Sequence, residues 1–397
     1  MGLPTGESPI SFSQIRTEFG TDGDNTNGPV RLGQYRNTDP SFSNKNVGSL
    51  TNLSLDSGIG FVPGAPGAIN VDAFHGKKLN VIVDYYSGST ENRPNDARTK
   101  YQASSASGNR VVVGGYKDRV VDDSSGSKVI IHVNKTIGSA TGSVNNCAVR
   151  TGTGWESGTS LSIVVGSSGA IYGAGGNGGA GGGKAGSTSS AESGSNGGDG
   201  TSALGISYNG TNVILASGAI ISKGYGGGGG GGSANGIEEG GGEDNLFLEH
   251  VGSGGGGGAG LPVGEGGTVS SPDTSETATD HNTQGQAGNA GNDATTTLAG
   301  TGGAAGSDRN IGQGGYAGGG KGGDGGDAEQ SAQDGNPGET QGGEWQNGPN
   351  AGGAGEAGGD GAAIRKASGV SWSFGTNLGT ITGEGAGGSG ESPTGVS

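Results

Sequence analysis

The four histidines are the side chains best suited to catalysis or metal binding near neutral pH, and their spacing supports neither. They are His75, His132, His250 and His281. None stands in an HExxH motif or has a second histidine or cysteine at ligand spacing. His132 alternates with the apolar neighbours Ile131 and Val133, which is typical of a strand position.

Cys147 is the single cysteine of the chain. One cysteine excludes an intramolecular disulfide and any metal site built on several thiolates. It stands in the sequence NNCAVR beside apolar residues, so we expect a small buried packing residue.

Carboxylates gather in residues 271–282, SPDTSETATDHN, where they could bind calcium. The segment lacks the D-x-[DN]-x-[DN]-G spacing of a calcium loop, so a solvated acidic loop is the favoured interpretation. Matches to GxGxxG are inevitable in so glycine-rich a chain, and no GxxxxGK[ST] is present. No Ser/His/Asp arrangement follows from spacing either. We expect no enzymatic activity, no cofactor and no metal site.

The charge balance and the N-terminus restrict the partners. The net charge is −16 and the pI near 4.6, which disfavours nucleic acid because phosphate binding needs basic patches. The start MGLPTGESPIS has no basic region followed by an apolar stretch, so we expect no signal peptide. Gly6 stands where a myristoylation signal needs Ser or Thr. No apolar run approaches membrane-spanning length, so we expect no membrane insertion.

Glycine supplies 99 of the 397 residues, and it recurs every third residue in separate runs. From Gly175 the chain reads GGN-GGA-GGG, and from Gly319 it reads GGK-GGD-GGD. A period of three is that of the polyproline II helix, which makes no internal hydrogen bonds. The phase predicts a bundle of polyglycine II helices over 173–397, held together by hydrogen bonds between helices. A flexible glycine linker is the alternative, with a collagen triple helix a distant third.

Residues 1–78 carry a short internal repeat that predicts a compact module with short helices. The pattern apolar-x-apolar-x-x-apolar occurs at residues 10–15, 30–35 and 69–74. Ser11 and Gln14 form an S-x-x-Q capping box. The candidates for docking on another protein are Phe12 and Ile15 of the first copy, Phe19 on the same helical face, and Leu32 and Tyr35 of the second copy. An ordinary small mixed domain is the alternative.

Residues 79–172 contain short β-branched runs bounded by Gly, Ser and Asn, which predict a β-sandwich or small barrel. A second repeat appears at the edges of the glycine runs, at residues 160–173, 212–224 and 371–383. Each copy is an apolar strand, a turn, Ala or Thr, an isoleucine and then glycines. We expect these strands to border the glycine bundle, with the final copy returning to pair near the first.

The large side chains of the second half concentrate between the glycine runs, in segments that we expect to be loops. Loops held by a rigid scaffold often carry recognition, and exposed aromatic residues are common at binding sites. The candidate receptor-binding residues are Phe247, His281, Tyr316 and Trp345. The alternative is that the aromatic residues cover the end of the bundle.

The segments SPISFSQIRTEFG and GPVRLGQYRN resemble a short N-terminal motif of bacteriophage tail and fibre proteins. The passages SSGAIYGAGGNGGAGG and ASGAIISKGYGGGGGGG resemble the glycine-rich domains of phage tail-fibre and tail-tip adhesins. That resemblance implies a virion protein of the phage tail whose N-terminal module binds other tail proteins, while polyglycine II presents loops to a host receptor, protein or glycan. Phage fibres are often trimeric, but a bundle built from one chain needs no partner.

Two other functions stay open beside the adhesin. One is a purely structural virion protein in the neck, baseplate or capsid decoration. The other is binding to ice or another ordered surface, which the outward Lys and Asp of GGK-GGD-GGD disfavour. A depolymerase ranks last, because no carboxylate pair can be placed.

Overall fold

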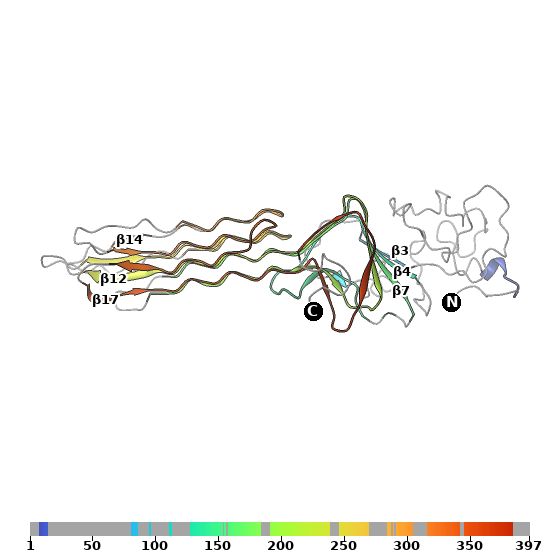
Figure 1. Ribbon diagram of the computed structural model, residues 1–397, viewed down its shortest axis with the longest axis horizontal. Coiled ribbons are helices and arrows are strands. Elements are labelled where there is room, and N and C mark those ends of the chain that lie inside the picture. Colours follow the sequence, from blue (N-terminus) through green and yellow to red (C-terminus); the bar gives the residue numbers. More distant parts are fainter. Residues whose placement is uncertain are drawn as a thin grey trace.

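The computed structural model is elongated and mostly β, with parallel strands at one end, glycine-rich segments in the middle and short strands at the far end (Figure 1). The structure describes residues 8–14, 81–85, 95–96, 111–112, 128–153, 155, 158–183, 191–238, 246–269, 284–286, 289, 291–304, 316–341 and 345–383. Within these ranges no helix is long and apolar enough to cross a membrane.

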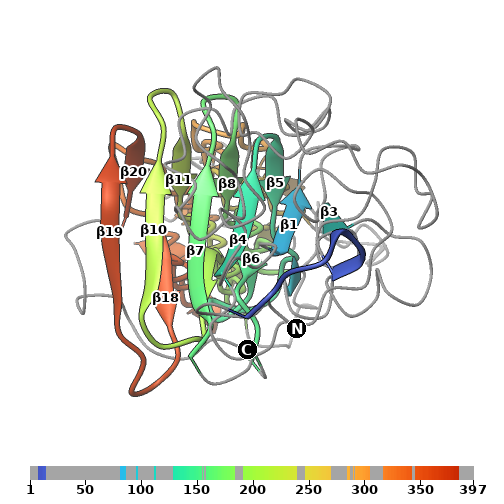
Figure 2. The same cartoon turned by 90° about the vertical axis from the view of Figure 1, so that its right-hand side faces the viewer.

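Three sheets form the end that we call the solenoid (Figure 2). The first, in the order β19-β10-β7-β4-β1-β3, holds β1 (Val81–Tyr85), β3 (Val111–Val112), β4 (Lys128–Val133), β7 (Ser160–Val165), β10 (Thr211–Leu215) and β19 (Trp372–Asn377). The second, β20-β11-β8-β5, holds β5 (Thr136–Gly138), β8 (Ala170–Tyr172), β11 (Ile220–Ser222) and β20 (Thr380–Thr382). The third, β18-β9-β6-β2, holds β2 (Asn95–Asp96), β6 (Cys147–Arg150), β9 (Ser202–Ile206) and β18 (Ile364–Lys366).

From β4 onward the chain visits the three sheets in a fixed rotation, and every pair of neighbours is parallel. The predicted sandwich or barrel is therefore wrong. An immunoglobulin-like sandwich pairs antiparallel strands, whereas these strands stack as successive coils. The near-continuous burial of β7, in which only Ser160 is exposed, is typical of parallel strands and indicates this arrangement.

The repeat at the glycine borders is the coil repeat of the solenoid. In the first sheet Val213 of β10 pairs with Ile163 of β7 and Phe374 of β19. In the second, Ile221 pairs with Ile171 and Ile381. The last copy returns to the sheets of the first, as predicted, but it pairs with the second copy, which lies between them. These stacked apolar residues form the hydrophobic core.

The glycine-rich segments leave the solenoid where the chain passes from the second sheet to the third, after β8 and again after β11. Residues 139–146 make the same passage between β5 and β6 without any glycine excursion. We call the set of glycine-rich segments the glycine rod. It consists of residues 173–183, 191–201, 223–233, 251–260, 263–269, 291–294, 299–304, 319–327, 331–338 and 352–363.

Neighbouring segments of the glycine rod are joined by backbone hydrogen bonds that recur every third residue. Gly227 and Gly230 donate to Gly198 and Ser195, each at 2.9 Å. The donors ascend while the acceptors descend, so these two segments run in opposite directions. Each extended segment thus satisfies its amides through its neighbours, as buried backbone groups require.

Two segments are surrounded on all sides, and they carry the longest glycine runs. The first, 223–233, is hydrogen-bonded to six others: 173–183, 191–201, 251–260, 319–327, 331–338 and 352–363. The second, 251–260, is likewise bonded to 173–183, 223–233, 263–269, 291–294, 299–304 and 319–327.

Steric space explains why the inner runs are pure glycine. A Cβ atom added to Gly229 would overlap the carbonyl oxygen of Gly355, and one added to Gly230 would overlap that of Ala180. Every glycine from 226 to 232 meets a neighbouring carbonyl in this way. The runs 226–232 and 254–258 therefore admit no side chain, and most side chains of the rod stand on the outer segments.

Those outward residues cap backbone amides on the outside of the glycine rod. Ser193, Asn196 and Asp199 stand three residues apart. They accept hydrogen bonds from the amides of Gly353, Glu356 and Gly359 at 3.1, 3.0 and 2.8 Å. Asn177, Asp293, Asp324 and Asp334 do the same in other outer grooves. An outer segment lacks a neighbour on its outside. The third residue of a triplet thus supplies the hydrogen-bond acceptor that this neighbour would otherwise provide.

Short strands continue the glycine rod at the end far from the solenoid, and we call them the distal cap (Figure 1). They interrupt segments that the sequence predicted as loops. A four-stranded sheet has the order β14-β13-β12-β17, and a hairpin pairs β15 with β16. The strands are β12 (Ala234–Glu238), β13 (Leu246–His250), β14 (Gln284–Gln286), β15 (Tyr316–Gly318), β16 (Glu339–Gln341) and β17 (Trp345–Ala351).

Candidate functional site

The distal cap gathers three of the four candidate receptor-binding residues. Phe247 lies opposite Ile237 on β12, and Trp345 lies opposite Glu238 on the same strand. Phe247 and Trp345 therefore stand on strands that flank β12 on either side, about 10 Å apart between backbones. Tyr316 lies opposite Gln341 in the adjacent hairpin.

The position of these residues differs in one respect from the expectation, because they stand in strands and not in loops. The sequence did not reveal these strands. Their strand patterns are weak, and long glycine-rich intervals separate some of the partners. His281 lies outside the described residues. A receptor-binding role for the four residues stays a prediction.

Only the start of the predicted attachment module lies within the described residues. A single helical turn occupies residues 12–14, and the capping box is confirmed. The Ser11 amide donates to Gln14 Oε1 at 2.7 Å, and the Gln14 amide donates to Ser11 Oγ at 3.1 Å. Ile10 packs against the solenoid core, and Phe12 is 53% exposed. Ile15, Phe19, Leu32 and Tyr35 lie outside the described residues.

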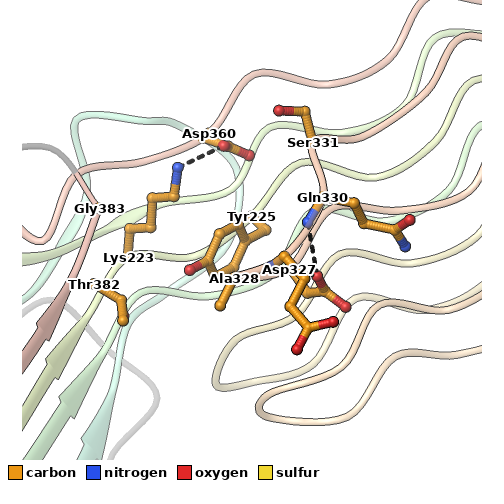
Figure 3. Close-up of a pocket in the computed structure, with 10 residues that line it drawn as sticks. Lys223, Tyr225, Asp327, Ala328, Gln330, Ser331, Asp360, Thr382 and Gly383 are labelled. Atoms are coloured by element: carbon orange, nitrogen blue, oxygen red, sulfur yellow. Dashed lines mark hydrogen bonds and ion pairs between the residues drawn. The ribbon is translucent and has the colours of Figure 1, made fainter.

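A pocket of about 340 Å³ lies where the glycine rod joins the solenoid (Figure 3), and we call it the basal pocket. It is built from four stretches that are distant in the sequence: the exit from β11, the turn at 327–331, the last glycine segment and the end of β20. Its lining residues are Lys223, Tyr225, Asp327, Ala328, Glu329, Gln330, Ser331, Asp360, Thr382 and Gly383.

One wall of the basal pocket is an ion pair held in place on several sides. Lys223 Nζ lies 2.6 Å from Asp360 Oδ2 and 4.8 Å from the centre of the Tyr225 ring. Asp360 Oδ1 accepts the amide of Gly226 at 2.9 Å, at the start of the central glycine run. The pair therefore ties segment 223–233 to segment 352–363, and the partly buried setting strengthens it relative to an exposed pair.

The opposite wall is a tight turn organised by Asp327. Its carboxylate accepts the amides of Ala299, Glu329 and Gln330 at 3.1, 2.9 and 3.1 Å. Burial pushes the pKa of this carboxyl up, but the three amide donors outweigh it, and the pKa lies below its ordinary value of 3.8. The sequence could not reveal this pocket, because Lys223 and Asp360 are separated by 137 residues.

The remaining reactive side chains are placed as structural residues. Burial raises the pKa of the Cys147 thiol to about 12, with Arg365 and Arg150 opposing the shift, so this cysteine is a poor nucleophile. His132 is buried within β4, at the strand position expected for it. Across the described ranges, no three His, Cys, Asp or Glu residues converge where they could hold a metal ion.

Comparison with known proteins gives one structural neighbour. No protein-family model matches the chain, and no curated protein matches it. The chain is similar to the crystal structure of the gp37-gp38 adhesin tip complex of the bacteriophage S16 long tail fibre. The identity is 19%, the match covers 81% of this chain and 88% of that chain, and the TM-score is 0.28.

Proposed function

We propose that this chain is a non-enzymatic virion protein, a bacteriophage tail-fibre or tail-tip adhesin that presents its distal cap to a host surface receptor. The observation that carries the proposal is the glycine rod, whose inner positions leave no room for side chains. Such a rod separates the solenoid from the distal cap and offers little binding surface of its own.

The proposal includes the conformation of the glycine segments, which we infer to be polyglycine II helices. Three features support it: hydrogen bonds that recur every third residue, the absence of bonds within a segment, and six neighbours around each inner segment. An experimental structure tests the inference through the backbone angles. It should give φ near −75° and ψ near +145° for residues 226–232.

The positions of the elements support different roles for the solenoid end and the distal cap. Ile10 packs against the solenoid core, so residues 8–14 lie at the end opposite the distal cap. We propose that this end binds other tail proteins. The inner glycine segment of 223–233 spans about 31 Å at about 3.1 Å per residue, which holds the distal cap well clear of that attachment.

Adsorption of phage to host cells tests the proposal. Phage carrying Phe247→Ala or Trp345→Ala should adsorb at least about thirtyfold more slowly, because truncating an anchor residue of an interface costs about 2 kcal/mol or more. Glu356→Ala, an exposed change on the flank of the glycine rod, is the matched control. Normal adsorption of both variants would contradict receptor recognition by these residues.

The alternative is a purely structural virion protein without a receptor. The dense backbone hydrogen bonding of the glycine rod favours this alternative, because a structural role requires only a rigid rod. Antibody labelling of intact virions separates the two functions. An adhesin has its distal cap at the host-facing end of the tail, whereas a neck or capsid location would support the structural role.

A further inference from the structure

The basal pocket carries hydrogen-bonding groups that the protein itself does not use. Within the part of the chain that the structure describes, the side chains of Glu329, Gln330 and Ser331 make no hydrogen bond or ion pair, and all three are exposed at the pocket. Lys223 uses one of its three N–H donors on Asp360. Residues that carry a carboxylate, an amide, a hydroxyl and an ammonium therefore line one cavity.

The frame that holds these groups is fixed before any ligand arrives. Three amides hold the Asp327 turn from which Glu329, Gln330 and Ser331 project. The Lys223 side chain lies between Asp360 and the Tyr225 ring, and its stem touches Gly383, where an added Cβ would come within 2.6 Å of Lys223 Cδ. The turn backbone and the Lys223 side chain are therefore pre-organised, which lowers the entropy lost on binding.

The chemistry of the lining selects the class of ligand. Apart from Ala328, Gly383 and the largely covered Tyr225 ring, every lining side chain is polar, so an apolar ligand gains little. The lining holds one cation, Lys223, and three carboxylates, on Asp327, Glu329 and Asp360, which disfavours an anionic ligand. Mixed donors and acceptors suit a molecule whose groups each donate and accept, as sugar hydroxyls do.

We propose that the basal pocket binds a neutral saccharide unit, with Glu329, Gln330, Ser331 and the free N–H groups of Lys223 as its hydrogen-bonding partners. The site lies at the base of the glycine rod, separate from the distal cap. This proposal does not depend on a receptor role for Phe247 or Trp345.

Saturation-transfer NMR on the full chain tests this. The probes are glucose, galactose and N-acetylglucosamine, with N-acetylneuraminic acid as the anionic comparator. At least one neutral sugar should bind, and the anionic sugar should not. The double variant Glu329→Ala/Gln330→Ala should bind about tenfold or more weakly, because it loses hydrogen bonds to a charged and a neutral group.

Two controls make the result decisive. The double variant removes no side-chain hydrogen bond or ion pair within the described residues, so its melting temperature should equal that of the parent chain. Glu356→Ala and Trp345→Ala should leave sugar binding intact. The proposal is overturned if no neutral sugar binds, if the anionic sugar binds equally well, or if the double variant binds as the parent does. Failure of Trp345→Ala to slow adsorption would bear on the distal cap alone.

Discussion

At the scale of the residue, the position of a glycine within the glycine rod decides whether it can be replaced. Gly229 sits in the central segment with the Gly355 carbonyl where its Cβ would be. Gly359 lies on an exposed outer position, where an added Cβ would lie 3.4 Å from Asp199 Oδ1, an ordinary contact. Replacement by alanine should therefore destabilise the protein strongly at Gly229 and hardly at all at Gly359.

We expect Gly229→Ala to destabilise the glycine rod by about 3 kcal/mol or more, because the methyl group must push two hydrogen-bonded segments apart. Gly359→Ala should change stability by less than about 0.5 kcal/mol, as is usual for surface substitutions. Thermal unfolding followed by circular dichroism measures both. Equal melting temperatures for the two variants would show that the inner segment is not packed as described.

Asp327 makes the base of the glycine rod sensitive to acid. Because its folded pKa lies below the ordinary value of 3.8, folding favours the ionised carboxylate. The stabilisation is present above pH 3.8 and is lost as the pH falls through the lower folded pKa. We expect the stability difference between the parent chain and Asp327→Ala to shrink as the pH falls from 5 to below that pKa. Melting temperatures of both proteins, measured across this pH range, check the prediction. If their difference stays constant with pH, ionisation of the Asp327 carboxylate is not its source.

At the scale of the element, each outer segment of the glycine rod needs hydrogen-bond acceptors for its backbone amides. A neighbouring segment or a short polar side chain supplies them. Ser193, Asn196 and Asp199 form one such ladder along a single groove. Their three acceptors serve three different amides, so the contributions should add approximately.

Replacing Asn196 by Ala should cost about 0.5–1.5 kcal/mol, the usual net value of one hydrogen bond. The triple change Ser193→Ala/Asn196→Ala/Asp199→Ala should cost roughly three times as much. Glu265→Ala is the control, because the Glu265 side chain is exposed and makes no hydrogen bond or ion pair within the described ranges. Denaturant unfolding measures the series, and a triple variant as stable as the control would remove the capping role.

Some of these elements could be predicted from the sequence and some could not. The period of three indicated extended glycine segments that bond to one another, and the strand-turn-isoleucine repeat indicated stacked strands. The parallel pairing was missed, because its partners, such as Leu215 and Asn377, are up to 162 residues apart and local patterns carry no pairing information. The basal pocket was missed for the same reason. Phe247 and Trp345 were chosen by residue type and their receptor role stays a prediction; the strands that place them on either side of β12 were not predicted.

At the scale of the whole molecule, the solenoid and the glycine rod are connected through a single kind of junction. Both glycine excursions leave between the second and third sheets, where residues 139–146 close the preceding coil directly. The solenoid should therefore be able to close its coils without the glycine rod.

Replacing residues 223–361 by the sequence of residues 139–146 should give a protein that still folds and unfolds cooperatively, since β11 and β18 would be linked as β5 and β6 are. Virions carrying this shortened chain should retain it but fail to adsorb, because the distal cap is removed. Loss of the shortened chain from the virion would show instead that residues 223–361 are needed for folding or attachment.

The glycines of the rod form a packed, hydrogen-bonded scaffold and not a flexible linker. Hydrogen–deuterium exchange of the full chain, read by mass spectrometry on peptides that cover 224–233, tests it most directly. The amides of 227–232 are all bonded to neighbouring segments, so they should exchange as slowly as those of β7 and β10 in the solenoid core. Exchange of these glycine amides within seconds, at the rate of an unfolded chain, would contradict the account.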